Sequence, residues 1–207
     1  MGRTGLFDLE KHFAFYGAYH SNPINIAIHV LFVWPIFFTA LMILYFIPPF
    51  FNIPNCEFYL FGNHVVLVWN VGFLVALTYS VFYFTLDLKV GSFAAFLCVL
   101  CWVGSSFVAA QLGFPLAWKV VLVAQIVCWA GQFIGHGVFE KRAPALLDNL
   151  IQAFVMAPFF VLLEGLQTLF GYEPYPGFHA IVQAKIDADI KEWQEFLASA
   201  WICVSIH

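Results

Sequence analysis

The sequence predicts an all-α protein, a polytopic bundle of four to five transmembrane helices with flanking amphipathic helices. Of its 207 residues, 63% are hydrophobic and 10% are charged, whereas soluble domains carry about 25% charged residues. The mean hydropathy is +0.88. The few charged residues are spaced so that they leave apolar segments of about 20 residues, the length that a helix needs to cross a bilayer. Together these observations predict an integral membrane protein.

Five apolar segments are candidate spans. The first begins at Asn22-Pro23, where an N-cap residue precedes a proline at the first helical position. Gly113 and Pro115 predict a tight turn between the third and fourth candidates. Turn residues fill the loop 50–63 between the first two. The candidates are Pro23–Ile47, His64–Leu86, Gly91–Gly113, Leu116–Phe139 and Leu146–Phe170.

The fifth candidate is interrupted by Pro158 and Glu164. It is either a kinked span or a helix buried against the others. Glu164 stands alone in an apolar run, and an ionisable residue in that position is a functional candidate by default.

Two amphipathic segments, 3–20 and 178–201, flank the apolar ones and are typical of interfacial helices. We therefore expect a membrane-embedded domain over residues 1–172, which holds the candidate catalytic site, and an amphipathic C-terminal tail over residues 173–207. The basic residues predict the orientation, because cytosolic loops are enriched in Lys and Arg. With a cytosolic N-terminus, the outer loops hold only Lys119, while the inner side holds Arg3, Lys11, Lys89, Lys141 and Arg142.

Histidines gather where the first span begins. The stretch 12–56 has no Asp, Glu, Lys or Arg, yet it contains His12, His20 and His29. Polar side chains are costly in hydrocarbon unless they are paired or ligated. On one helix, His12 and His20 would lie about 80° apart and face a common centre. In the predicted topology the fourth span ends on the same inner face, so we expect His136 at the depth of the other three.

These residue types suit a metal site. Imidazoles, with or without a carboxylate, hold Fe(II) while leaving positions open, although zinc accepts the same ligands. Glu140 lies one helical turn after His136 and shares its face, and Gly135 and Gly137 leave room for close approach. The predicted metal ligands are His12, His20, His29, His136 and Glu140. Polar residues at the same face, among them Tyr16, Asn25, Lys141 and Arg142, are candidates for orienting ligands or binding an anionic head group.

Two other interpretations remain open on the residues alone. The histidines could be interfacial side chains that are hydrogen-bonded to neighbours in a transporter or scaffold. Alternatively, His29 and a second imidazole could be the axial ligands of a haem.

The five cysteines show no pairing pattern, and Cys98 and Cys101 lie inside an apolar segment, where small packing residues are expected. No disulfide framework is predicted, and no basic patch points to nucleic acid.

Two sequence blocks resemble a known membrane-protein family. Residues 16–25, with His29 following, read YGAYHSNPIN and resemble the family's YxxYHxNPxN…H opening. Residues 135–146 read GHGVFEKRAPAL and resemble its GHxxFEKxxPAL segment. The blocks have the right order and spacing, and the resemblance covers about Leu6 to Tyr172. The chain is therefore similar to the 2-hydroxy fatty acid dioxygenase family.

The resemblance implies an Fe(II)-dependent enzyme of the endoplasmic-reticulum membrane. Its substrates would be molecular oxygen and a 2-hydroxy long-chain fatty acid, which α-oxidation shortens by one carbon during phytosphingosine breakdown. His12, His20, His29 and His136 match the family's histidines, and His20 and His136 are the expected catalytic residues. We further hypothesise that Lys141 or Arg142 steers the substrate carboxylate. The HxxxH and HxxHH boxes of di-iron desaturases are missing from the sequence, which favours a mononuclear site.

Overall fold

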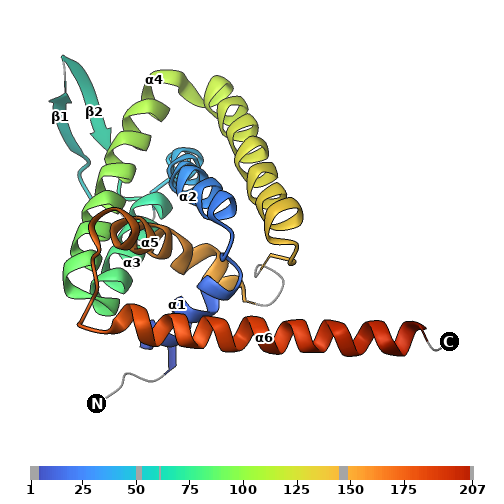
Figure 1. Ribbon diagram of the computed structural model, residues 1–207. Coiled ribbons are helices and arrows are strands. Elements are labelled where there is room, and N and C mark those ends of the chain that lie inside the picture. The colour runs from blue at the N-terminus through green and yellow to red at the C-terminus, as the bar shows by residue number, and fades with distance from the viewer. Residues whose placement is uncertain (1–4, 50–52, 61, 145–148, 206–207) are drawn as a thin grey trace.

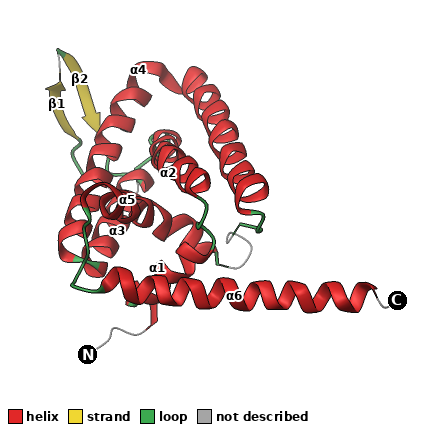
Figure 2. Cartoon of the chain, viewed as in Figure 1, coloured by secondary structure: helices red, strands yellow, loops and turns green. Residues whose placement is uncertain are grey.

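The computed structural model describes residues 5–49, 53–60, 62–144 and 149–205 (Figure 1). Within these ranges the fold is helical apart from one two-stranded hairpin (Figure 2). A short 3-10 helix, Gly5–Phe7, comes first. The six α-helices are α1 (Leu9–Ala18), α2 (Pro23–Leu44), α3 (Val71–Leu86), α4 (Leu88–Ile134), α5 (Ala157–Phe170) and α6 (Phe178–Ser205). The strands are β1 (Cys56–Leu60) and β2 (Asn63–Leu67), and two π-helical segments are η2 (Gly135–Glu140) and η4 (Gln152–Met156).

Side-chain caps set where four helices begin. Asp8 accepts from the Lys11 amide at the start of α1, and Asn22 accepts from the Ile24 amide at the start of α2. Asn70 and Asp87 do the same for α3 and α4. Each cap satisfies an amide that has no partner inside its helix. The predicted start of the first apolar helix at Asn22-Pro23 is thus confirmed.

Among the described residues, three helical segments are long and apolar enough to cross a membrane: Pro23–Leu44, Leu88–Glu140 and Gln152–Phe170. The second holds two of the predicted spans. At Gly113 the chain of α4 adopts φ 65° and ψ 161°, a conformation that favours glycine, and Pro115 follows. Figure 1 shows the result: the first arm rises in green, turns over at the top and returns in yellow. The predicted turn between these two segments is confirmed.

The predicted second span, His64–Leu86, is wrong at its start. Residues 63–67 pair with β1 in an antiparallel hairpin, and α3 begins only at Val71. Val65 and Leu67 point into the core as alternate residues of β2. Asn70 then caps α3 and donates to the carbonyls of Leu44 and Tyr45, which joins the start of α3 to the end of α2.

From Gln152 the predicted fifth segment is one continuous helical segment. It runs as the π-helical η4 into α5, and Pro158 lies in the first turn of α5, where a proline is tolerated. Residues 145–148, at the predicted start of this segment, lie outside the described residues.

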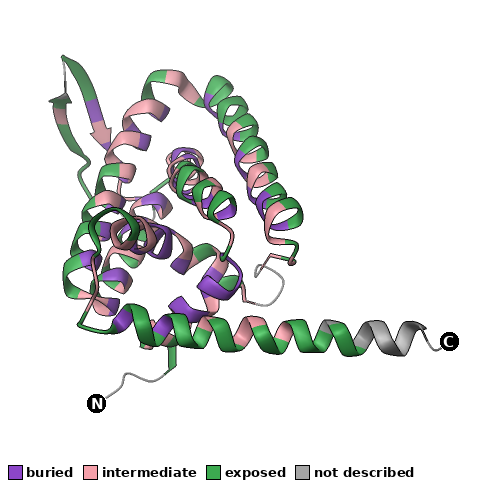
Figure 3. Cartoon of the chain, viewed as in Figure 1, coloured by how far each residue is buried: buried purple, intermediate pink, exposed green. Residues whose placement is uncertain are grey.

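Helix α2 packs against α3, both arms of α4 and α5. The main core gathers aromatic and aliphatic side chains between these helices, with Phe13 and Tyr16 of α1 included. Helix α6 lies against α1, where Gly17 leaves room for Ile186. Beyond α1, α6 continues past the bundle and is largely exposed (Figure 3). The amphipathic segment at the N-terminus is therefore part of the core, and it brings the start of α2 to its place.

Candidate metal centre

Three of the predicted histidines meet in the interior. His20 lies in the turn between α1 and α2, His29 is in α2, and His136 is in η2. One ligand nitrogen from each lies within 4.8 Å of the others. The ring centroids are 4.3 to 4.9 Å apart, and the rings meet edge-on at 71 to 81°. All three side chains are buried, so the expected convergence of His136 with His20 and His29 is confirmed.

Backbone carbonyls fix the orientation of two imidazoles. His20 Nδ1 bonds to the Tyr16 carbonyl at 2.8 Å, and His29 Nδ1 bonds to the Asn25 carbonyl at 2.9 Å. A carbonyl only accepts, so each Nδ1 carries the proton and each Nε2 keeps its lone pair. This arrangement is typical of metal-ligating histidines. His20 Nε2 is buried without a hydrogen-bond partner among the described residues, as is His136 Nδ1.

Electrostatics favour the form of His20 that can bind a metal. Burial lowers the pKa of His20 well below its usual range, and the neighbouring His29 and His136 lower it further. The imidazole is therefore neutral at physiological pH, as metal ligation requires. A buried, neutral set of three imidazoles with unpartnered nitrogens fits a single metal ion.

The local fold explains how His136 reaches the other two. Gly135 lies against Asn25 so closely that a Cβ at position 135 would overlap the Asn25 side chain. The π-helical turn that follows carries His136, and such turns are frequent at functional sites. The expectation of close approach holds for Gly135, whereas a Cβ on Gly137 would meet nothing within 4 Å.

The structure does not bring Glu140, a predicted ligand, into the group of three. Its carboxylate accepts from the backbone amides of Ser21 and Asn22 and from Asn25 Nδ2, each at 3.0 Å, and from the Ser21 hydroxyl. Helical spacing placed Glu140 near His136 correctly. These donors hold both of its oxygens, so it ties the end of η2 to the turn that carries His20.

The structure does not bring His12, another predicted ligand, into the group either. Its Nε2 bonds to the Gly5 carbonyl at 3.1 Å, and its Nδ1 accepts from Gln152 Nε2 at 2.8 Å. Both ring nitrogens are therefore engaged. The chain leaves α1 before His20, so the single-helix spacing that paired the two histidines does not apply.

The predicted substrate-binding residues have other partners or positions. Arg142 donates to the Ala18 carbonyl at 2.8 Å and to Asp189 at 3.1 Å, and its guanidinium stacks 3.7 Å from the centroid of the Tyr19 ring. Lys141 ends η2 in a left-handed conformation and is exposed. Asn25 is fully buried, and its Nδ2 donates to the Tyr19 carbonyl and Glu140. These three residues, and Glu164, do not line the pocket described next.

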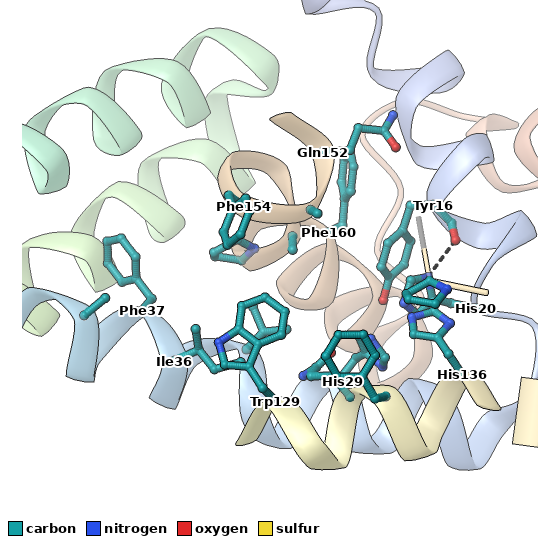
Figure 4. Close-up of a pocket in the computed structure, with 18 of the residues that line it drawn as sticks. Tyr16, His20, His29, Ile36, Phe37, Trp129, His136, Gln152, Phe154 and Phe160 are labelled. Carbon is teal, nitrogen blue, oxygen red and sulfur yellow. Dashed lines mark hydrogen bonds between the residues drawn. The ribbon is translucent and has the colours of Figure 1, made fainter. Parts of the chain in front are cut away.

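A pocket extends from the histidines into the bundle (Figure 4). Figure 4 shows the three histidines at one end, with Ile36, Phe37 and Phe154 toward the other. Along α2 its wall runs from His29 to Ala40, about 16 Å at 1.5 Å per residue. The rest of the wall is mostly apolar and aromatic, and it includes Val33, Tyr79, Trp129, Phe133, Pro144, Ala153, Ala157, Pro158 and Phe160.

Besides the histidines, the lining residues with polar groups are Tyr16, Tyr79, Trp129, Gln132 and Gln152. Gln132 was not among the predicted site residues. A usable signal was present, because a glutamine one turn before His136 in an apolar span is itself unusual. The sequence contained no comparable signal for the apolar wall of the pocket, because phenylalanine is common throughout the chain.

Comparison with known proteins gives one family. The family described as "2-hydroxy-palmitic acid dioxygenase Mpo1-like" matches residues 6–169. The 2-hydroxy-palmitic acid dioxygenase MPO1 of Saccharomyces cerevisiae is 32% identical over 187 residues, which is 90% of this chain and 92% of the yeast protein. No solved structure matches significantly.

Proposed function

The chain belongs to the Mpo1-like 2-hydroxy-palmitic acid dioxygenase family, and on that premise we propose that it is an Fe(II)-dependent dioxygenase of 2-hydroxy long-chain fatty acids. The reaction removes one carbon by α-oxidation and consumes molecular oxygen. The observation that carries the proposal is the buried cluster of His20, His29 and His136 at the head of an apolar pocket.

The three imidazoles would hold the iron. Fe(II) bound there supplies Lewis acidity and dioxygen activation. The chain contributes three neutral nitrogens, two of them fixed in orientation by backbone carbonyls, and this number of protein ligands leaves positions open toward the pocket. His20 and His136 also contribute the buried nitrogens that lack a partner.

The shape of the pocket supports a long-chain substrate. The polar groups lie at one end, and the wall along α2 continues over Val33, Ile36 and Phe37 to Ala40. A fatty acid bound with its carboxyl end at the histidines would bury its chain along this wall, which is favourable in proportion to the apolar area removed from water. The same wall excludes water from the carbon atoms next to the carboxyl group.

We propose a polytopic membrane protein of four to five spans, formed by α2, α3, the two arms of α4 and the segment Gln152–Phe170. Large apolar side chains are exposed on the outward faces of these helices, for example Leu31, Val81 and Ile126. Such surfaces suit lipid and are rare in soluble monomers. We place the protein in the endoplasmic-reticulum membrane with the site at the cytosolic face.

The geometry favours this proposal over a haem protein. Axial imidazoles lie on opposite faces of a flat macrocycle, whereas the three histidine rings meet edge-on with centroids 4.3 to 4.9 Å apart, which leaves no room for a macrocycle between any two of them. A transporter or scaffold does not need unpartnered imidazole nitrogens buried together, since a buried polar group without a partner is destabilising.

The test is a reconstitution under anaerobic conditions. The purified protein is loaded with Fe(II) and mixed with 2-hydroxypalmitate. Oxygen is then admitted, and its uptake and the C15 product are measured together. We expect uptake to match product formation and palmitate, which lacks the 2-hydroxyl, to support neither. If iron is retained but 2-hydroxypalmitate supports no uptake, the proposed reaction is wrong. If no iron is retained, the metal site is wrong.

A further inference from the structure

Two hydrogen-bond donors inside the pocket have no acceptor. The Tyr16 hydroxyl and Gln132 Nε2 are both buried without a partner among the described residues. The side chains are only 5% and 6% exposed, and both line the pocket with the three histidines. A buried donor without an acceptor destabilises the fold, so two of them in one pocket indicate a ligand that accepts from both.

Tyr16 is placed beside the first imidazole. Its ring stacks on His20 with the centroids 4.1 Å apart and the planes at 17°, while its carbonyl oxygen orients the same imidazole. Its ring also packs against Phe13 and Phe160. Figure 4 shows the Tyr16 hydroxyl at the end of the ring that faces the histidines. The ring is thus fixed by packing, and the hydroxyl is directed into the site.

Gln132 approaches from the opposite helix. It lies four residues before His136 in the second arm of α4, about one helical turn away and on the same face. Its side chain therefore reaches the pocket beside His136, whereas Tyr16 reaches it beside His20. The two donors flank the histidine cluster from α1 and α4.

The basic residues near this end are not available for a ligand in the pocket. Arg142 is bound to the Ala18 carbonyl and Asp189, and Lys141 is exposed outside the pocket. Recognition of an anionic head group by this chain therefore falls to neutral donors. A carboxylate accepts several hydrogen bonds and donates none, and it is the group that a 2-hydroxy acid brings to the histidine end.

We propose that the Tyr16 hydroxyl and Gln132 Nε2 donate hydrogen bonds to the carboxylate of the bound 2-hydroxy acid and so determine the specificity for free acids. This inference rests on the proposed function. It also replaces Lys141 and Arg142 as the expected carboxylate partners. A site built around such donors rejects an analogue that cannot accept from them.

The test measures binding without turnover. Equilibrium binding of 2-hydroxypalmitate to the iron-loaded protein is measured without oxygen for the wild type, Tyr16→Phe and Gln132→Met. We expect the Kd of each variant to rise about tenfold or more, the usual effect of losing a hydrogen bond to a charged group. The methyl ester of the same acid keeps a carbonyl acceptor but has no charge, so its Kd should rise less than that of the acid in each variant.

Tyr79→Phe is the matched control. Tyr79 lines the same pocket, but its hydroxyl already donates to the Phe154 carbonyl at 3.0 Å, so its loss should not change the Kd of the acid. Iron content and thermal stability are measured on every variant. Tyr16→Phe and Gln132→Met remove unpartnered donors, so both variants should be at least as stable as the wild type.

An unchanged Kd in both variants would overturn the inference while leaving the proposed reaction standing. A fall in stability with an unchanged Kd would also overturn it, because the two donors would then belong to the fold. If the wild type neither binds nor oxidises the acid, the proposed function fails and the inference fails with it. A larger rise in Kd for the acid than for its methyl ester, with iron retained, is the supporting result.

Discussion

Two polar regions join α2 to the second arm of α4, and only one of them has complete hydrogen bonding. In the middle of the bundle, Gln125 Nε2 donates to the Ile36 carbonyl at 2.9 Å and to the Thr39 hydroxyl at 2.8 Å, and Gln125 Oε1 accepts from Trp129 Nε1 at 2.9 Å. Seven residues later, Gln132 Nε2 has no partner among the described residues. The histidine cluster beside it likewise contains unpartnered nitrogens.

The difference separates a structural contact from a binding site. The Gln125 region satisfies its own groups, so it can hold two apolar helices together without anything added. The histidine region leaves donors and acceptors unused in a place where water is largely excluded. Two glutamines on one helix therefore have different roles, although the sequence presents them in the same way.

The largest effect should come from removing an imidazole. His136→Ala or His20→Ala takes one of three ligands from the proposed iron, and we expect loss of bound iron and of oxygen uptake with 2-hydroxypalmitate. Metal analysis and uptake on the same preparation measure both. His179→Ala is the control, since its Nδ1 accepts from Gln167 away from the cluster. Normal iron content and turnover in both ligand variants would refute the assignment.

Glu140→Gln should have a smaller effect because Glu140 acts through the ligands. The variant replaces one acceptor oxygen by an amide, which then faces the donors of either Ser21 or Asn22. Loss of such an outer partner typically lowers metal affinity about 10–100-fold. An iron titration should show this weaker binding, with full activity regained at saturating iron. Activity that stays absent at saturating iron would show that Glu140 does more than position the His20 turn.

Replacing each of the two glutamines by methionine should affect stability differently. Gln125→Met leaves the Trp129 indole without its acceptor and the Ile36 carbonyl without this donor, so we expect a loss of about 1–3 kcal/mol in stability. Gln132→Met should cost no stability. Thermal unfolding in one detergent measures both variants, and iron content should be unchanged in each. Equal destabilisation would remove the distinction between the two regions.

Part of the site could be predicted from the sequence because the order of the apolar segments fixes the depth of each histidine in the membrane. Counting apolar segments placed His136 at the level of His20 and His29, and the structure brings these three together. His12 was grouped with them on its place before the first span, on helical spacing and on the family resemblance. Its actual partner, Gln152, is 140 residues away in the chain, and no local pattern indicates that contact.

Local sequence patterns also left part of the fold unpredicted. The short run HVVLV at residues 64–68 is apolar in either conformation, so hydropathy alone does not distinguish a strand from the start of a span. Asn70, which caps α3, was the available signal for the true start. The pocket depends on which phenylalanines of α2, α4 and η4 face one another, and that follows only from packing.

The smallest expected effect is at a solvent-exposed ion pair between α1 and α6. Changes at the two buried regions should all have larger effects than a change at this pair. Glu10 of α1 bonds to Lys185 of α6 at 2.6 Å and accepts from the Tyr175 hydroxyl. These two hydrogen bonds lower the pKa of Glu10 below its usual value of 4.5. A carboxylate with a lowered pKa contributes its full stabilisation above the unfolded value and loses it as the pH falls through the folded value. Protonation of Glu10 below pH 4.5 should therefore loosen α6 from α1.

Hydrogen exchange of α6 at a series of pH values, corrected for the intrinsic rate, measures this loosening. The added exchange at low pH should be small, because exposed ion pairs contribute little. In Glu10→Gln the pH dependence should disappear, and α6 should exchange at every pH as it does in the acidified wild type. A pH response that persists in Glu10→Gln would assign it to another carboxyl on this face, of which Asp189, bound to Arg142, is the nearest alternative.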